Sequence, residues 1–198
     1  KNQPVIPASV LCKQMGFPIT VGDTGLVAKE LVLYDGPFAE DGSQEEVFNV
    51  TALLVENTTQ DLISSAQITL CSGPVELVFY IEMIPPGSAV LVPEQSRQKF
   101  QQMTFTRCTG WAKKGRELRE KVLIVPSSMG TYRVINNSKK RLTGLAIYHK
   151  GWIYPQGIYL GGRAYRTVIS SLEPGQSVEV FPSFFCWGYS DIAAILQE

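Results

Sequence analysis

The amino-acid sequence predicts an all-β protein, built as two tandem Ig-like β-sandwich domains related by an internal repeat. Short runs of alternating apolar residues, rich in Val, Ile, Tyr and Phe, are separated by turns rich in Asn, Pro and Gly. One hairpin pattern is also written twice, as IEMIPPGSAVLVP at 81–93 and SSLEPGQSVEVFP at 170–182. No long stretch repeats every 3.6 residues, so helices are not expected to contribute to a core.

The repeat extends beyond these two turns. Residues 55–70 align with 134–149 at a shift of 79, and residues 77–92 align with 165–180 at a shift of 88. The difference is a nine-residue insertion in the second copy, inside KGWIYPQGIYLGGRA. After the first turn, KFQQMTF (99–105) aligns with GYSDIAA (188–194). A period of about 85 residues is the size of a domain and too long for a solenoid repeat.

The strands follow from this alignment in matched pairs. Asn57 and Asn136 end two β-branched runs, as turn residues that tolerate a left-handed backbone. Each Pro-Gly pair then forms a hairpin turn, with Pro fixing φ and Gly free to adopt positive φ. The matched strands are FNVTALLVEN (48–57) with TYRVINN (131–137), ISSAQITL (63–70) with LTGLAIYH (142–149), and LVFYIE (77–82) with YRTVIS (165–170).

Four segments result. Residues 1–28 form an extended segment along the first domain, because they carry three prolines and no clear period. The first β-sandwich covers 29–112 and the second covers 118–198. Residues 113–117 are the linker, because KKGRELREK has too few apolar positions for a core helix and could form only one helical turn.

Composition narrows the function class. The chain has 44% apolar and 18% charged residues, and no apolar run approaches the roughly 18 residues that span a bilayer. Residues 1–112 carry 6 basic and 12 acidic residues, while 113–198 carry 12 basic and 6 acidic. These are two solvated surfaces, or else the basic half meets an anionic partner or docks on the acidic half. The opening KNQPVIPAS suits a mature chain whose leader has been removed.

Metals, cofactors and nucleic acid are not expected. The four cysteines (Cys12, Cys71, Cys108, Cys186) have no C-x-x-C spacing, and His149 is the only histidine, so no zinc set is present. The four cysteines allow three disulfide pairings, and the sequence does not choose among them. We expect most of the thiols to be free and buried. A pI near 6.8 and the absence of a recognition motif disfavour nucleic acid.

The second half carries a family resemblance. The order VINNSKKRLTGLAIYHKGW…GGRAYRTVISSLEPGQSVEVFPS resembles small extracellular β-sandwich modules of Gram-positive bacteria, including the FxLYD-like domains. ELVLYDGPF echoes their Leu-Tyr-Asp element in the first half. Such modules are often lipoproteins or surface proteins. The resemblance therefore implies a non-catalytic module that is extracellular or on the cell surface, and a lipid anchor on the full precursor stays open.

An enzyme is the competing class. A secreted hydrolase would have to use acidic residues or His149, because no G-x-S-x-G, Walker or H-E-x-x-H sequence is present. His149 aligns with Leu70 at a strand end and is expected to be packed and hydrogen-bonded. The acidic run FAEDGSQEE (38–46) is expected to be a solvated loop, with a weak calcium-loop alternative.

The aromatic residues point to a binding site instead. Ten of the twenty aromatics lie within residues 148–189. The insertion is predicted to form an extra hairpin that leaves a large ring on the surface for a cell-surface glycan or protein. The candidate ligand-binding residues are Trp152, Tyr154, Tyr159 and Arg163. The alternative is that Tyr165, Phe181 and Phe185 fill the core while the other rings hold the insertion down.

Overall fold

The computed structural model describes the chain except for residues 1–9, 12–15, 44, 128–130, 154–155 and 182–188. The described residues contain strands, one short 3-10 turn and no α-helix, so the all-β prediction is confirmed. Nothing in this part of the chain is a helix of the length and apolar character needed to cross a membrane. The elements in chain order are β1 (Val10–Leu11), β2 (Ile19–Thr20), β3 (Leu26–Phe38), β4 (Glu45–Asn57), β5 (Leu62–Ser72), β6 (Val75–Ile84), β7 (Ala89–Pro93), β8 (Arg107–Gly115), η1 (Arg119–Lys121), β9 (Val122–Pro126), β10 (Tyr132–Asn136), β11 (Leu142–Ile153), β12 (Ile158–Leu172), β13 (Ser177–Val180) and β14 (Tyr189–Gln197).

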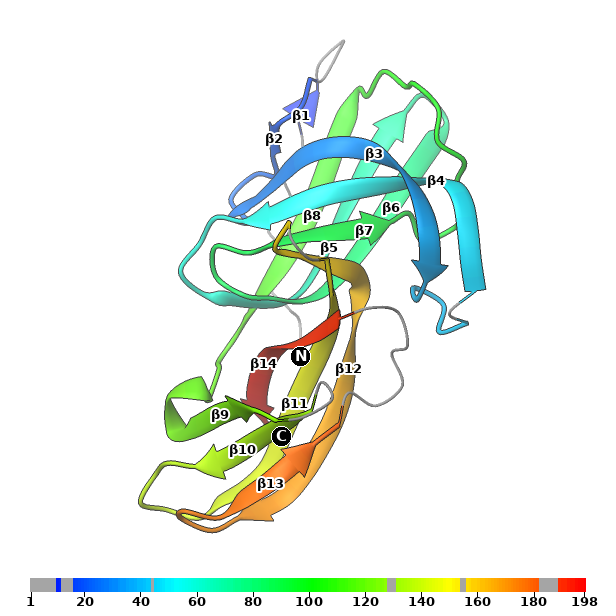
Figure 1. Cartoon of the computed structure of the whole chain (residues 1–198). Helices are drawn as coiled ribbons and strands as arrows, with labels where there is room; N and C mark the ends of the chain where they lie inside the picture. Colours follow the sequence, from blue (N-terminus) through cyan, green and yellow to red (C-terminus); the bar gives the residue numbers. More distant parts are fainter. Residues whose placement is uncertain (1–9, 12–15, 44, 128–130, 154–155, 182–188) are drawn as a thin grey trace.

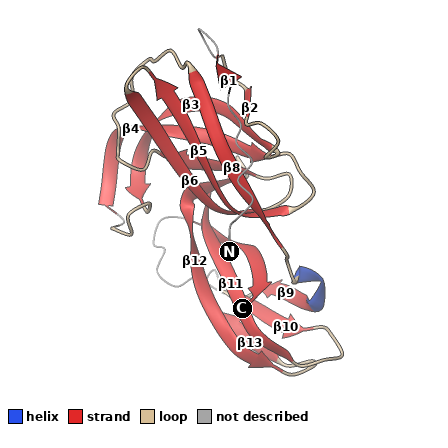
Figure 2. Cartoon of the chain, turned by 180° about the vertical axis from the view of Figure 1, so that it is seen from behind, coloured by secondary structure: helices blue, strands red, loops and turns tan. Residues whose placement is uncertain are grey.

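The strands form three sheets in two stacked units. A four-stranded sheet has the order β1-β8-β5-β6, and a three-stranded sheet has the order β13-β10-β9. A seven-stranded sheet, β14-β11-β12-β7-β4-β3-β2, runs through both units (Figure 1). Figure 2 shows the four-stranded sheet from behind, on the opposite side of the first unit from β3 and β4. The first unit is called domain 1 below, and the unit containing β9 to β14 is called domain 2.

The two domains have the same order of strand neighbours. In domain 1, β4 lies between β3 and β7, and β5 lies between β8 and β6. In domain 2, β10 lies between β9 and β13, and β11 lies between β14 and β12. The counterpart of β14 is therefore β8. The alignment of 99–105 with 188–194 is wrong, because 99–105 is mostly loop.

A buried Asn makes the same hydrogen bonds in each domain. The Asn57 side-chain amide donates to the backbone oxygens of Asp61 and Ile84, and its side-chain oxygen accepts from Thr59. The Asn136 amide donates to Lys140 and Leu172 oxygens, and its side-chain oxygen accepts from Ser138. The oxygens that these amides meet differ in position by 79 and 88, the two shifts of the sequence alignment. The prediction of plain turn residues missed this, because both Asn side chains are buried hydrogen-bonding hubs.

The cores follow the alternation of the strands. Leu77, Phe79 and Ile81 lie on one face of β6 and are fully buried, as are Ile68 and Leu70 on β5. This core of domain 1 also includes Tyr159, Ala193 and Ala194 from domain 2. Domain 2 keeps a second core of its own around Leu145, Ile147 and Ile195. Because domain 1 is packed partly by side chains of domain 2, the domains share apolar surface.

The structure differs from the sequence-based prediction at some domain boundaries and at one residue that was placed in the core. Strand β8 continues to Gly115, so residues 113–115 are paired with β5 and only the last part of the predicted linker connects the domains. The expected helical turn is the 3-10 turn η1. Strand β3 begins at Leu26, three residues before residue 29, where the first domain was predicted to start. Phe181 is 62% exposed and does not fill the core, because it continues the outward side of β13.

Candidate functional site

The nine-residue insertion forms the tip of the β11–β12 hairpin, and this tip lies against domain 1. Trp152 pairs with Tyr159 across the hairpin, with their rings edge to face at 4.8 Å. Tyr159 and Leu160 then pair in parallel with Val90 and Leu91 of β7. This parallel pairing joins the sheets of the two domains into one.

The structure brings together only part of the predicted aromatic site. Tyr159 is 6% exposed and belongs to the core of domain 1, and Trp152 is half-buried against the same core. Tyr154 lies outside the described residues. Arg163 is exposed farther along β12, where its guanidinium faces domain 1. A ring that fills a core offers no face to a ligand, so these rings act mainly as packing between domains.

A buried lysine lies beside the insertion at the domain junction. Lys150 on β11 has no exposed surface, and its Nζ donates to the backbone oxygen of Glu82 at 2.6 Å. The oxygen of Gly162 lies 3.4 Å away. Burial lowers the pKa of Lys150 to about 8, although the carboxylates of Glu40 and Glu82 oppose that shift.

A buried carboxylate of domain 1 faces the same junction. Glu40, in the loop between β3 and β4, accepts the backbone N–H of Gly162 at 3.0 Å. Burial raises the pKa of Glu40 to about 7, against the opposing effects of that hydrogen bond and of Lys150 and Arg163. Arg163 donates from Nε to the Glu40 backbone oxygen and lies 3.6 Å from the Glu82 carboxylate. The basic half of the chain therefore meets the acidic half here.

Gly162 permits this close approach. A Cβ at this position would collide with the backbone oxygen of Tyr80 and would lie 2.7 Å from the Glu40 carboxylate. Gly162 therefore lets strand β12 pass directly against β6 of domain 1.

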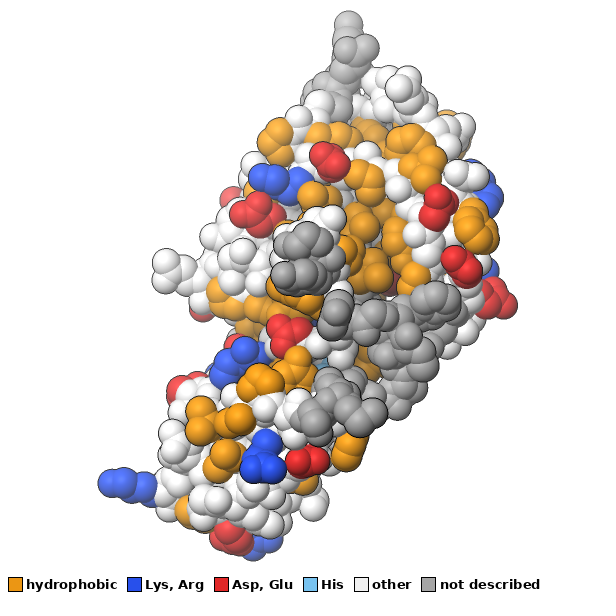
Figure 3. Space-filling model, in the orientation of Figure 1, with side chains coloured by type: hydrophobic (Ala, Val, Ile, Leu, Met, Phe, Trp, Pro, Cys, Tyr) orange, Lys and Arg blue, Asp and Glu red, His pale blue; other side chains and the backbone are white. Residues whose placement is uncertain are grey.

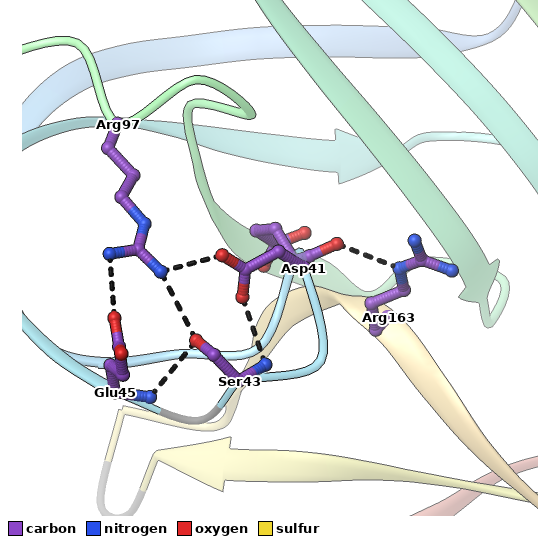
Figure 4. A network of polar contacts seen from close by, with 6 residues as sticks. Asp41, Ser43, Glu45, Arg97 and Arg163 are labelled. Atoms are coloured by element: carbon purple, nitrogen blue, oxygen red, sulfur yellow. Dashed lines mark hydrogen bonds and ion pairs between the residues drawn. The ribbon is translucent and has the colours of Figure 1, made fainter.

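The acidic loop is held by an arginine (Figure 4). Arg97 contacts the Asp41 carboxylate at 2.6 Å and the Glu45 carboxylate at 2.9 Å, and its guanidinium lies 4.6 Å from the centre of the Phe38 ring. Hydrogen bonds from Ser43, with those from Arg97, lower the pKa of Asp41 to about 2. The described residues contain no group of three His, Cys, Asp or Glu side chains placed to hold a metal ion. Two of the loop's carboxylates are thus paired within the chain.

His149 is buried without a hydrogen bond. Its side chain is 1% exposed, and within the described structure neither ring nitrogen has a partner, contrary to the expected hydrogen-bonded ring. Its ring lies 6.2 Å from that of Tyr132, whose hydroxyl contacts Asp191. Burial lowers the pKa of His149, with Asp191 opposing. A catalytic base needs a proton donor within hydrogen-bond reach, and this ring has none there.

Two of the four cysteines lie in the described residues, and both are free and buried. Cys71 and Cys108 sit on neighbouring strands, where Cys108 pairs with Leu70 and Cys71 pairs with Arg107. Side chains alternate along a strand, so the two thiols point to opposite faces of the sheet. The Arg107 guanidinium lies 3.4 Å from the Cys71 sulfur. Cys12 and Cys186 lie outside the described residues.

An open cleft lies at the end of domain 1 away from domain 2. Its volume is about 530 Å³, within the range typical of small-ligand pockets. The loop joining β7 to β8 forms one wall and arches over the end of the domain (Figure 1). The cleft is lined by Phe17, Glu30, Leu31, Phe100, Gln101, Gln102, Met103, Thr104 and Phe105.

Both ends of this loop are fixed. The buried carboxylate of Glu94 accepts the backbone N–H groups of Ser96 and Gln98. The N–H of Phe100 donates to the Asn49 oxygen, and the N–H of Thr106 donates to the Cys71 oxygen. Residues 101–105, which form the cleft wall, therefore lie between two anchored ends. This anchoring pre-forms the cavity and lowers the entropic cost of ligand binding.

The apolar and polar parts of the cleft are separate. Phe105 is 2% exposed and packs edge to face on Phe17 at 6.1 Å, so the half-buried rings of Phe17 and Phe100 form the aromatic floor that a ligand can reach. Glu30, Gln101 and Thr104 are exposed at the rim, where they can orient a ligand. An apolar floor with a few polar groups is the usual composition of a ligand site.

A second apolar cluster lies on the outer face of the seven-stranded sheet. Figure 3 shows hydrophobic side chains over β3, β4 and β7 on this face. Phe38, Val50 and Ala52 of the cluster are nearly inaccessible. The cluster is therefore mainly structural.

Comparison with known proteins gives no relative: no family model matches the chain, and no curated protein matches it. The functional argument therefore rests on geometry. The cleft was missed from the sequence because KFQQMTF was aligned as a strand of the repeat. This stretch has a single β-branched residue, Thr104, and no strict alternation of apolar and polar residues, and this is the signal that would have favoured a loop.

Proposed function

We propose that the protein is a non-catalytic extracellular binding module whose ligand site is the cleft of domain 1. The observation that carries this proposal is the pre-formed cavity of about 530 Å³ with an aromatic floor and a polar rim. The proposal moves the site from the predicted insertion to residues 100–105, because the insertion's described rings pack between the domains.

The state of the titratable groups favours binding over hydrolysis. Asp41 and Glu45 are paired with Arg97, and the described surroundings of His149 offer no nucleophile to its ring nitrogens. Nucleophilic catalysis requires a nucleophile and a base within hydrogen-bond reach. A secreted hydrolase remains the second candidate, and it would have to use the buried carboxyl of Glu40, whose pKa is raised to about 7.

We also infer that the two domains are Ig-like sandwiches related by an internal repeat. The matching strand orders and the matching hydrogen bonds of Asn57 and Asn136 support this inference. The cell-surface location of the module rests on the resemblance to Gram-positive surface modules. In this arrangement domain 2 holds domain 1 rigidly through the inserted hairpin, and domain 1 carries the ligand.

The test is a titration of isotope-labelled protein with small aromatic, saccharide and amine probes, followed by amide chemical shifts. Binding in the cleft is expected to shift Gln101, Gln102 and Thr104. Replacing Thr104 with Trp should fill the rim and abolish these shifts. The matched control is Thr143→Trp, at an exposed position on β11 of domain 2. Shifts confined to Trp152 and its neighbours, or no shifts with any probe, would overturn the proposal.

A further inference from the structure

The charge of the cleft is set by one side chain. Glu30 is the single charged residue among those that line the cavity, and it is exposed at the rim. Among the described residues no basic side chain lies within ion-pair distance of its carboxylate. The neighbouring cation, Lys29, is paired with Glu56 at 3.3 Å instead.

The backbone directs Glu30 toward this rim. Strand β3 shifts its register against β4 between Ala28 and Glu30, so an extra residue is accommodated there. A β-bulge of this kind turns the side chains next to it and is common beside binding sites. Lys29 is thereby placed against Glu56 while Glu30 borders the cavity.

The rest of the wall complements a cation with an apolar body. Phe17 and Phe100, both half-buried, supply aromatic rings, and ring faces attract cations. Gln101 and Gln102 supply amide oxygens that accept hydrogen bonds from an ammonium group. The half of the chain that forms the cleft is also acidic overall, because residues 1–112 carry 12 acidic and 6 basic residues. Within the part of the chain that the structure describes, an anionic ligand would meet the Glu30 carboxylate and no lining cation.

We propose that the cleft of domain 1 binds a small organic ammonium ion, with its apolar body on the phenylalanine floor and its charged group at Glu30. This inference rests on the proposed function, because it specifies the ligand of the same cavity. Glu30 is solvent-exposed, so its contribution is modest: about three- to fivefold in affinity over a neutral ligand of the same shape.

The experiment compares three probes that share a phenyl ring and a short chain: phenethylammonium, phenethyl alcohol and hydrocinnamate. Amide shifts of Gln101 and Gln102 are followed in titrations at low ionic strength. The expected order of affinity is ammonium, then alcohol, then carboxylate. Raising the salt concentration should reduce the difference between them, because exposed charges are screened over about 10 Å at 0.1 M.

Two matched variants assign the preference. Glu30→Gln should bring the ammonium ion and the alcohol to equal affinity while the alcohol still binds. Glu46→Gln removes the same charge at an exposed site outside the cleft and should keep the preference. If the alcohol or the carboxylate binds as well as the ammonium ion, the ligand class is wrong and the binding site stands. If no probe shifts the cleft amides, the proposed function fails and this inference fails with it.

Discussion

The hairpins β5–β6 and β11–β12 occupy the same position in their domains and end differently. The first turns directly after Ser72 at Gly73, which has φ of 58° and open space around it. The second continues to Ile153 and Ile158 and enters domain 1. The comparison shows that the longer hairpin tip joins one sheet of each domain into the seven-stranded sheet, while the four-stranded and three-stranded sheets stay separate.

The largest expected effect on the domain junction comes from the pH dependence that Glu40 gives to the stability of the fold. The pKa of Glu40 is raised from 4.5 to about 7, so the folded state holds the proton more tightly than the unfolded state. The corresponding stability is fully present below pH 4.5 and is lost as the pH rises through 7. We expect the loss to be on the order of 3 kcal/mol, and Glu40→Gln should remove it while still accepting the Gly162 N–H.

The measurement is urea unfolding near pH 5 and near pH 8. The Gln variant should match the parent at the lower pH and exceed it at the higher pH. Glu46→Gln, an exposed change of the same charge, should follow the parent at both. A Gln variant that is destabilised equally at both pH values would contradict the account of the buried carboxyl.

Asn57 and Asn136 test the feature that the two domains have in common, a buried asparagine with the same set of hydrogen bonds. Asn57→Ala and Asn136→Ala each leave buried backbone oxygens and an N–H without a partner. Each should cost about 2–3 kcal/mol in the free energy of unfolding. Asn137→Ala, at an exposed neighbour with only a backbone hydrogen bond described, should cost little. Strongly unequal losses in denaturant titrations would count against equivalent positions in a repeat.

The sequence predicted the strands and the matching turns because these depend on local alternation and on Pro-Gly chemistry. Leu77, Phe79 and Ile81 share a buried face as expected. The insertion was predicted as an extra hairpin, whereas it lengthens the β11–β12 hairpin, whose turn at Gly157 the sequence does suit. Its docking was not predictable, because pairing of Tyr159 with Val90 joins residues far apart in sequence and leaves no local signal.

The candidate site was less predictable than the fold. Counting aromatics placed the site at Trp152 and Tyr159, but composition does not distinguish a ring on the surface from a ring between domains. The cleft depends on how Glu94 anchors its loop, through a buried carboxylate that accepts three backbone N–H groups. A carboxylate used in this way has the same sequence signature as a solvated one.

Gly162 tests the junction sterically, with Gly73 as its counterpart on a free hairpin tip. Gly162→Ala should cost about 2 kcal/mol, because the new methyl group would overlap the Tyr80 oxygen and force β12 away from β6. Gly73→Ala meets no atom within 4 Å and should lose only about 1 kcal/mol from its left-handed backbone. The measurement is the thermal unfolding of both variants, which compares their losses of stability. A larger loss for Gly73 would mean that the hairpin tip, and not the junction, limits stability.

His149 tests a difference between the two cores, because the sequence alignment at a shift of 79 matches it with Leu70, which is fully buried in domain 1. Burial lowers the pKa of His149 below 6.5, so the folded state disfavours the proton that the unfolded state binds. This contribution to stability is present above pH 6.5 and is lost as the pH falls below it, opposite in direction to that of Glu40.

His149→Leu gives domain 2 the residue of domain 1 and should flatten the acid limb of the stability profile. The effect should be smaller than the effect of Glu40→Gln on the alkaline limb. The check is the pH dependence of the unfolding midpoint between about pH 4 and pH 7. An acid limb as steep in the Leu variant as in the parent would show that groups other than His149 control the acid response.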